Sequence, residues 1–237
     1  MYSLLQNKLV KPLLSFNMQS VDGLFGGFAE GDFAVLYGMP TVLPLSLLLA
    51  VRAQLPFQLG GLETNVVFVD GGNSFRLYQV SRIAQLHQLD PRQVQRRIYI
   101  SRAFTAYQMT SLVLEKLKET LWLHPKLVII SDIAGLYFDK DIPPREAKEV
   151  FSQLTLYLSR FSQENDLIVI ATCLPHFDSR QDSFFREMAC GRANVALSVK
   201  PSKFGQRLFL EKHPFFPLGG AEFSSENLTL NQFMESD

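Results

Sequence analysis

The sequence predicts an α/β domain built on a mainly parallel, twisted sheet with helices on both faces. Three observations support this fold class. The chain of 237 residues is 47% hydrophobic, which is enough to bury one large core. Apolar runs typical of buried parallel strands alternate with segments whose apolar residues recur at helical spacing. The expected strands are residues 33–37, 66–69, 98–101, 126–132 and 166–173.

The chain is expected to form an N-terminal arm, residues 1–18, and a single core domain, residues 19–237. The arm mixes apolar residues with Lys8, Lys11 and Pro12, and it is too short to fold as a domain of its own. We therefore expect it to pack against the core.

The first strand, 33–37, leads into a turn at Gly38 and an apolar helix. Proline suits the first position of a helix, so we expect this helix to begin at Pro44. Many α/β proteins carry a phosphate-binding loop here, with the pattern G-x-x-x-x-G-K-[ST]. Counted from Gly38, the second glycine falls on Leu43, the lysine on Pro44 and the hydroxyl residue on Leu45. The strand, turn and helix that would hold such a loop are predicted here, but the second glycine, the lysine and the hydroxyl residue of the pattern are absent.

Two later strands end in acidic residues, Asp70 and Asp132. Functional side chains collect at the carboxyl ends of strands in open α/β sheets. Each aspartate has two interpretations: a remnant metal ligand, or a cap for the turn that follows. Helices are expected at 75–87, 106–122 and 144–164.

The last part of the chain differs in pattern. Residues 176–192 are polar and are expected to form a loop, followed by short antiparallel strands at 195–200, 203–213 and 221–230 along the edge of the sheet. Between Arg180 and Lys212 there are seven basic and three acidic residues. Basic groups with interleaved aromatics suit single-stranded DNA, although the phenylalanines could instead pack on the protein or a partner. The candidate DNA-binding residues are Arg180, Phe184, Phe185, Arg186, Arg192, Lys200 and Lys203.

Composition excludes several classes of function. The formal net charge is zero, which argues against binding nucleic acid through the whole surface. Cys173 and Cys190 lack the spacing of metal ligands, and the histidines are scattered, so no metal site is predicted. No apolar run is long enough to span a bilayer and no signal peptide is evident. We expect a cytoplasmic protein, associated with the nucleoid if it binds DNA.

Four stretches in this order resemble the catalytic core of the RecA/RadA recombinase family, most closely its archaeal and eukaryotic branch. They are SVDGLFGGFAEGDFAVLYG, VVFVDGGNSFRLYQ with the residues up to RAFTAYQM, KLVIISDIAGLYF, and DLIVIATCLPHFDSR with the closing strands. The resemblance runs from about Ser20 to Phe223 and implies a RecA-like P-loop NTPase core. It implies a catalytic acidic strand end at Asp70, a magnesium-associated position at Asp132, and a DNA-binding loop at 176–192. We expect this chain to lack a counterpart of the helical domain that precedes the core in full-length recombinases.

The departures from the family pattern concern catalysis. Pro44 removes both the lysine charge and a backbone N–H from the degenerate Walker A motif, and Leu45 cannot bind magnesium. The water-orienting glutamate of the family corresponds to Gly72. The nucleotide-binding remnant is therefore Gly38, Pro44, Leu45, Asp70 and Asp132. No catalytic residue is expected, and binding of ATP and Mg²⁺ is expected to be weak or absent.

The sequence thus predicts a pseudo-ATPase, a recombinase paralogue that acts by binding. Its expected role is that of an accessory or mediator in homologous recombination and DNA repair, with a RecA/RadA-type recombinase or another paralogue, single-stranded DNA, or both as partners. Two alternatives stay open. One is a KaiC-like signalling or scaffold protein with protein partners only. The other is an ATPase completed in trans by a partner subunit.

Overall fold

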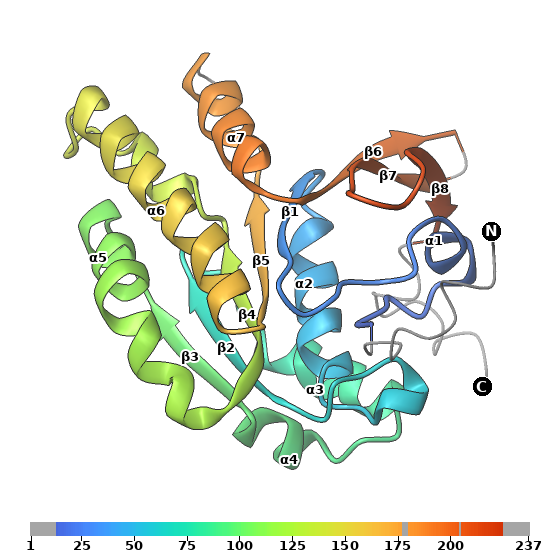
Figure 1. Ribbon diagram of the computed structural model, residues 1–237. Coiled ribbons are helices and arrows are strands. Elements are labelled where there is room, and N and C mark those ends of the chain that lie inside the picture. The colour runs from blue at the N-terminus through green and yellow to red at the C-terminus, as the bar shows by residue number, and fades with distance from the viewer. Residues whose placement is uncertain (1–12, 177–179, 204, 225–237) are drawn as a thin grey trace.

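The computed structural model describes residues 13–176, 180–203 and 205–224, apart from the side chains of 180–182 (Figure 1). Its centre is one eight-stranded sheet in the order β3-β2-β4-β5-β1-β6-β7-β8. The strands from β3 to β6 in this order run parallel, and β7 and β8 are antiparallel additions at one edge. This confirms the predicted fold class. The strands are β1 Phe33–Gly38, β2 Asn65–Asp70, β3 Ile98–Arg102, β4 Pro125–Ser131, β5 Ile168–Cys173, β6 Val195–Ser202, β7 Gly205–Lys212 and β8 Gly219–Phe223.

Helices cover both faces of the sheet (Figure 1). α2 and α3 pack over one face, and α5, α6 and α7 pack over the other. After α5 the chain continues through a wide helical turn, Leu112–Lys116, and a tight one, Leu117–Leu123, so the segment predicted as one helix is helical throughout but irregular. The helices are α1 Gln19–Leu24, α2 Val42–Arg52, α3 Leu77–Leu86, α4 Pro91–Arg96, α5 Ala106–Ser111, α6 Pro144–Glu164 and α7 Arg180–Arg192.

The continuous apolar runs are explained by burial of the strands on both faces. In β4, Leu127 and Ile129 lie in the core under α2, while Val128 and Ile130 lie in the core under α6. Successive side chains of a strand point to opposite faces, so a strand covered on both sides needs apolar residues at every position.

α2 begins at Val42, two residues before the predicted start at Pro44. The turn after β1 is tight, because Val42 N–H donates to the Met39 carbonyl at 3.1 Å and Leu43 N–H donates to the Pro40 carbonyl at 3.1 Å. Pro44 is consequently the third helical residue. It is tolerated there because the first amides of a helix have no intrahelical acceptor.

The described part of the arm packs into the core. Leu14 pairs with Phe28 in a short antiparallel bridge, and Phe16 and Met18 are buried beside it. Residues 1–12 of the predicted arm lie outside the described residues, as do residues 225–230 of the last predicted strand.

The segment 176–192, predicted to be a loop, instead contains the 13-residue helix α7. Phe185 and Ala189 are spaced by one helical turn, and both are buried against the core under α6. Charged residues between them obscure this period in the sequence. The loop prediction was therefore wrong for most of the segment, and residues 177–179 lie outside the description.

Candidate functional site

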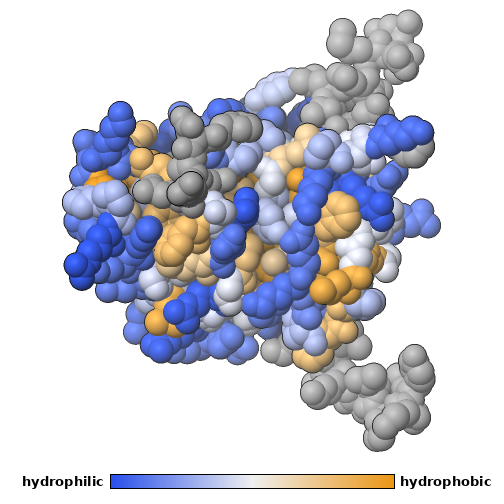
Figure 2. All heavy atoms as spheres, turned by 90° about the horizontal axis from the view of Figure 1, so that it is seen from above, coloured by the Kyte–Doolittle hydropathy of each residue, from blue (hydrophilic) through white to orange (hydrophobic). Residues whose placement is uncertain are grey.

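The carboxyl ends of the parallel strands form one edge of the molecule, which Figure 2 shows end on. Apolar side chains gather in the middle of this face among hydrophilic ones. Met39 and Leu174, which follow β1 and β5, are half-buried and pack on the core. The sheet order places the ends of β2 and β4 side by side, so it brings Asp70 close to the Ser131–Asp132 pair.

Asp70 is fully buried at the end of β2 and holds the turn that follows. Its carboxylate accepts hydrogen bonds from Ser74 N–H at 2.8 Å, Ser131 Oγ at 2.9 Å and Phe75 N–H at 3.3 Å. The guanidinium Nε of Arg102 lies 3.1 Å from Oδ2. Burial alone would raise the pKa of Asp70, but the hydrogen bonds from Ser74, Ser131 and Phe75 outweigh it and lower the pKa. Both carboxylate oxygens are thus engaged within the protein.

Asp132 links the ends of β4 and β5. Its N–H donates to Thr172 Oγ1 at 2.8 Å, and its Oδ1 accepts from Leu174 N–H at 3.2 Å. His176 Nε2 lies 3.3 Å from the same oxygen. The residue is 5% exposed, and its backbone has a φ of +45°.

Gly72, at the position of the family glutamate, lies directly against Asp132. A Cβ added at Gly72 would lie 2.9 Å from Asp132 Cβ, which is closer than real Cβ contacts. Any side chain at position 72 therefore requires Asp132 or the backbone to shift.

Gly38 ends β1 with a φ of +105° and lies tightly against β6. A Cβ here would be 2.2 Å from the Val199 carbonyl oxygen. Met39 N–H donates to the same oxygen at 3.0 Å. Packing against β6 is thus sufficient reason for a glycine at this position.

Four of the five backbone N–H groups of residues 39–45 are paired within the protein, and that of Thr41 is not among them. Those of Met39, Val42, Leu43 and Leu45 donate to protein carbonyls, and Pro40 and Pro44 have no N–H. A phosphate loop works by presenting such amides to the ligand. Here each of the four is already paired.

The side chains at the pattern positions are apolar or engaged. Leu45 is 1% exposed in the core. Ser46, the nearest hydroxyl, is equally buried and donates to the Leu43 carbonyl at 2.7 Å. In the part of the chain that the structure describes, no group of three or more histidine, cysteine or acidic side chains is arranged to hold a metal.

The DNA-binding candidates on α7 are placed in different environments. Phe185 is 1% exposed and packs against the rings of Phe138 and Phe151, so the prediction that it stacks on bases is wrong. Phe184 is 36% exposed, with Lys148 Nζ 4.7 Å from its ring centroid. Arg192 is exposed at the end of the helix. The side chain of Arg180 lies outside the description.

The candidates near β6 belong partly to a polar network centred on Glu211. The Glu211 carboxylate accepts from the Tyr37 hydroxyl and lies 3.0 Å from Lys200 Nζ. Arg186 lies over the Tyr37 ring at 5.6 Å. Lys203 is exposed beyond this network. Glu211 is one of the three acidic residues counted in the sequence, and on the folded surface it pairs with Lys200, one of the DNA-binding candidates.

An apolar surface around the β3 edge was missed from the sequence. We call it the β3 patch. β3 ends the sheet and pairs only with β2 among the described strands. Exposed apolar side chains lie on β3, where Tyr99 and Ile100 are on opposite faces of the edge, and on the segments that follow it in the chain: Phe104, Tyr107 and Trp122. The Tyr99 and Trp122 rings lie 6.5 Å apart, and Trp122 is 74% exposed. Such a patch beside an unpaired strand edge is a typical protein-binding surface.

Comparison with known proteins identifies the family. A family model described as Rad51 matches residues 14–184. The chain belongs to the Rad51 family. The DNA repair and recombination protein RadA of Aeropyrum pernix is 26% identical over 196 residues, which cover 82% of this chain and 57% of that protein. The resemblance to the RecA/RadA family read from the sequence is confirmed.

The Rad51 match covers the parallel strands β1 to β5 and ends within α7. β6, β7 and β8 therefore lie outside the matched residues. This chain spans little more than half the length of the RadA relative. Among the described residues, no helix of this Rad51-family chain is long and apolar enough to cross a membrane.

Proposed function

We propose that this Rad51-family protein is a non-catalytic accessory or mediator of recombination and DNA repair, which acts by binding a recombinase instead of hydrolysing ATP. The observation that carries the proposal is the β1–α2 turn, whose amides at Met39, Val42, Leu43 and Leu45 donate to protein carbonyls. RadA, a relative that covers most of this chain, is named for DNA repair and recombination, which supports the biological setting.

The chemistry of phosphoryl transfer supports the loss of catalysis. The reaction depends on positioning and on stabilising charge through a lysine, a magnesium-binding hydroxyl and a group that orients water. The corresponding residues are Pro44, Leu45 and Gly72. None of them carries a charge or a hydroxyl.

The test of this part uses ATP and MgCl₂ with the purified chain. We expect no nucleotide-dependent rise in Tm and no phosphate release above that of buffer. An Asp132→Asn variant is the control, since it removes the remaining acidic group of the magnesium-associated position. Turnover that the wild type shows and this variant loses would overturn the proposal. Activity that arises only after mixing with a partner subunit would favour the ATPase completed in trans.

The β3 patch is our proposed binding surface for a RecA/RadA-type recombinase or another paralogue. The two edges of the sheet differ: α1 lies beside β8 (Figure 1), with Ser20 Oγ donating to the Glu222 carbonyl at 2.5 Å. The outer edge of β3 has no such cover among the described residues. An extended segment of a partner can add to an open edge through main-chain hydrogen bonds. Because its side chains would alternate between the two faces, they could pack on Tyr99 and Trp122 on one face and on Ile100 on the other.

Affinity measurements with the recombinase of the same organism test this surface. Ile100→Lys places a charge in the patch, and we expect it to weaken binding at least tenfold. Leu218→Lys is the matched control, because Leu218 is also exposed (62%, against 44% for Ile100) but lies beyond β7, away from β3. Equal affinities of the two variants and the wild type for the recombinase would rule out the β3 patch as its binding surface.

Direct contact with single-stranded DNA is the second part of the proposal, together with association with the nucleoid. The exposed side chains of Arg192 and Lys203 support it, whereas burial of Phe185 and the Glu211 network favour the KaiC-like alternative with protein partners only. Charge reversal at Arg186, Arg192 and Lys203 distinguishes them. If single-strand affinity and its salt dependence do not change, the protein-only alternative stands.

A further inference from the structure

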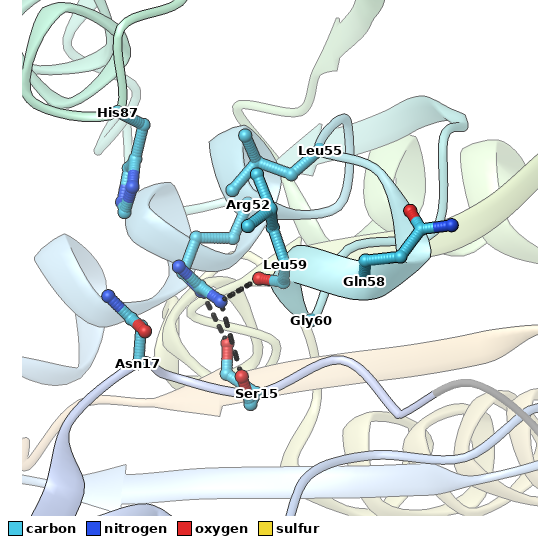
Figure 3. Close-up of a pocket in the computed structure, with 8 residues that line it drawn as sticks. All are labelled: Ser15, Asn17, Arg52, Leu55, Gln58, Leu59, Gly60 and His87. Carbon is cyan, nitrogen blue, oxygen red and sulfur yellow. Dashed lines mark hydrogen bonds between the residues drawn. The ribbon is translucent and has the colours of Figure 1, made fainter.

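A buried arginine lies at the opposite end of α2 from the β1–α2 turn. Arg52 is the last residue of α2 and is only 1% exposed. It lines a cavity of about 370 Å³ between the arm, the end of α2, residues 57–60 and the end of α3 (Figure 3). Neither the phosphate-loop pattern nor the proposed recombinase surface includes this residue.

Among the described residues, the Arg52 guanidinium is held by neutral acceptors alone. Nε donates to the Ser15 carbonyl at 2.7 Å, and Nη2 donates to Ser15 Oγ at 3.2 Å and to the Leu59 carbonyl at 2.8 Å. A guanidinium has five N–H donors, and these bonds use three. Within the described residues, Nη1 has no hydrogen-bond partner.

The positive charge of Arg52 has no paired carboxylate in the described part of the chain. Asp22 interacts with it electrostatically but forms no ion pair with it. The Asp22 carboxylate instead accepts from Phe16 N–H at 3.2 Å. A buried charge without a counter-ion is unfavourable, because carbonyl oxygens replace the lost hydration only in part.

Two neutral polar side chains, Asn17 and His87, line the cavity together with Arg52. In Figure 3, Asn17 and His87 lie across the guanidinium from Leu59. Burial and the nearby charge of Arg52 lower the pKa of His87, so its ring is neutral near pH 7. Leu55 and Leu59 provide an apolar wall, and none of the described residues that line the cavity carries a carboxylate.

We propose that this cavity binds a phosphate group, either as free inorganic phosphate or as a small phosphate monoester. A planar carboxylate pairs best with two parallel N–H donors, but the Nε and Nη2 donors of Arg52 already bond to Ser15 and Leu59. A tetrahedral oxyanion can take Nη1 together with donors from other directions, such as Asn17 and His87. The cavity volume lies at the lower end of the range of about 300–1,000 Å³ for small-molecule sites.

The experiment compares sodium phosphate and glycerol 3-phosphate with sodium chloride at equal ionic strength, by thermal unfolding and calorimetry. We expect a saturable, phosphate-dependent rise in Tm of the wild type. Asn17→Asp places a carboxylate where the anion would bind. This variant should lose the response and unfold in chloride at the wild-type Tm or above, because the carboxylate pairs with Arg52.

Asn73→Asp is the matched control. Asn73 shares the left-handed backbone of Asn17, with φ of +47° and +60°, but lies after β2, away from the cavity. This variant should respond to phosphate as the wild type does. Binding of phosphate to the wild type should also raise the pKa of His87, measured by NMR, because a bound anion favours the imidazolium.

The calorimetric Kd values also distinguish the two sources of the phosphate group. A lower Kd for inorganic phosphate indicates free phosphate as the ligand, and a lower Kd for glycerol 3-phosphate indicates a phosphate monoester. No saturable response to either ligand in the wild type overturns the proposal. So does a response of equal size in Asn17→Asp. Neither result bears on ATP hydrolysis, because the cavity and the β1–α2 turn share no residue.

Discussion

Gly38 shows how a glycine of a nucleotide-binding pattern can be required by packing. Its φ of +105° and the predicted 2.2 Å approach of a Cβ to the Val199 carbonyl both exclude a side chain. The second constraint comes from β6, which pairs with β1 and is far away in the sequence. No pattern of neighbouring residues could have revealed it.

Gly38→Ala should destabilise the protein by about 3 kcal/mol or more, because the clash is with backbone and cannot be relieved by a side-chain rotation. Urea unfolding measures the loss. Gly31→Ala is the control: its φ of +92° is also positive, but nothing lies within 4 Å of an added Cβ. We expect a loss of about 1–2 kcal/mol there. Equal losses would show that contact with Val199 contributes nothing.

Asp70 was correctly singled out in the sequence as a strand-end acid, but its partners could not be predicted. Ser131 and Arg102 come from β4 and β3, and the sheet order alone brings them to Asp70. The buried carboxylate thus contacts three segments: the turn after β2, the end of β4 and the end of β3. Its role in stability is therefore measurable through pH.

Asp70→Asn should cost about 2–4 kcal/mol at pH 7, because the amide cannot accept the same set of hydrogen bonds. The lowered pKa of Asp70 in the folded protein stabilises the fold above the unfolded pKa, about 3.9. This stabilisation is lost as the pH falls through the folded pKa. Urea unfolding between pH 6 and 2 should show the gap between wild type and variant closing below about pH 4. A constant gap would contradict the assignment.

α7 is the element that the sequence predicted least well, and α2 was misplaced only at its start. The apolar face of α7 consists of residues such as Phe185 and Ala189 among charged neighbours, so its helical period is weak. α2 starts at Val42 and not at Pro44, because hydrogen bonds within the turn already give residues 42 and 43 a helical conformation. Local signals were sufficient for the parallel strands, where burial on both faces produces uninterrupted apolar runs.

Phe185→Ala should destabilise the protein by about 3–5 kcal/mol, since it empties a site packed against Phe138 and Phe151. The adjacent Phe184→Ala should cost less than about 1 kcal/mol, because that ring is partly exposed and contacts Lys148. Chemical denaturation of both variants checks the orientation of the helix. Similar losses for the two would mean that α7 is rotated.

In the whole molecule, the sheet order decides which surfaces are open. From the sequence, the strands and the antiparallel addition at the C-terminal end could be predicted, but the position of β3 at an edge could not, because its run of five residues resembles a buried strand. Arg52 was missed for a similar reason. An arginine in the last turn of a helix is usually solvated, and only the packing of the arm and residues 57–60 buries it.

Trp122 is the only tryptophan of the chain and lies in the β3 patch. Its 74% exposure predicts efficient fluorescence quenching by acrylamide in the isolated protein. Binding of a recombinase at the β3 patch should decrease the quenching constant several-fold, measured with a partner that lacks tryptophan. The Ile100→Lys variant should show no such decrease at the same concentrations. Unchanged quenching in a complex shown to form would place the partner elsewhere.

The paired amides of the β1–α2 turn limit what substitutions of side chains can do there. Substitution could return a lysine or a threonine to positions 44 and 45, but it would not free the amides of Val42 and Leu43 from the carbonyls of Met39 and Pro40. To present these two amides to a phosphate, the backbone would have to unwind the first turn of α2 and follow another path. Such unwinding would remove the packing of the first turn of α2 before the amides could contact a phosphate. A single substitution could therefore place a lysine or a hydroxyl at this turn without making the paired amides available to a phosphate.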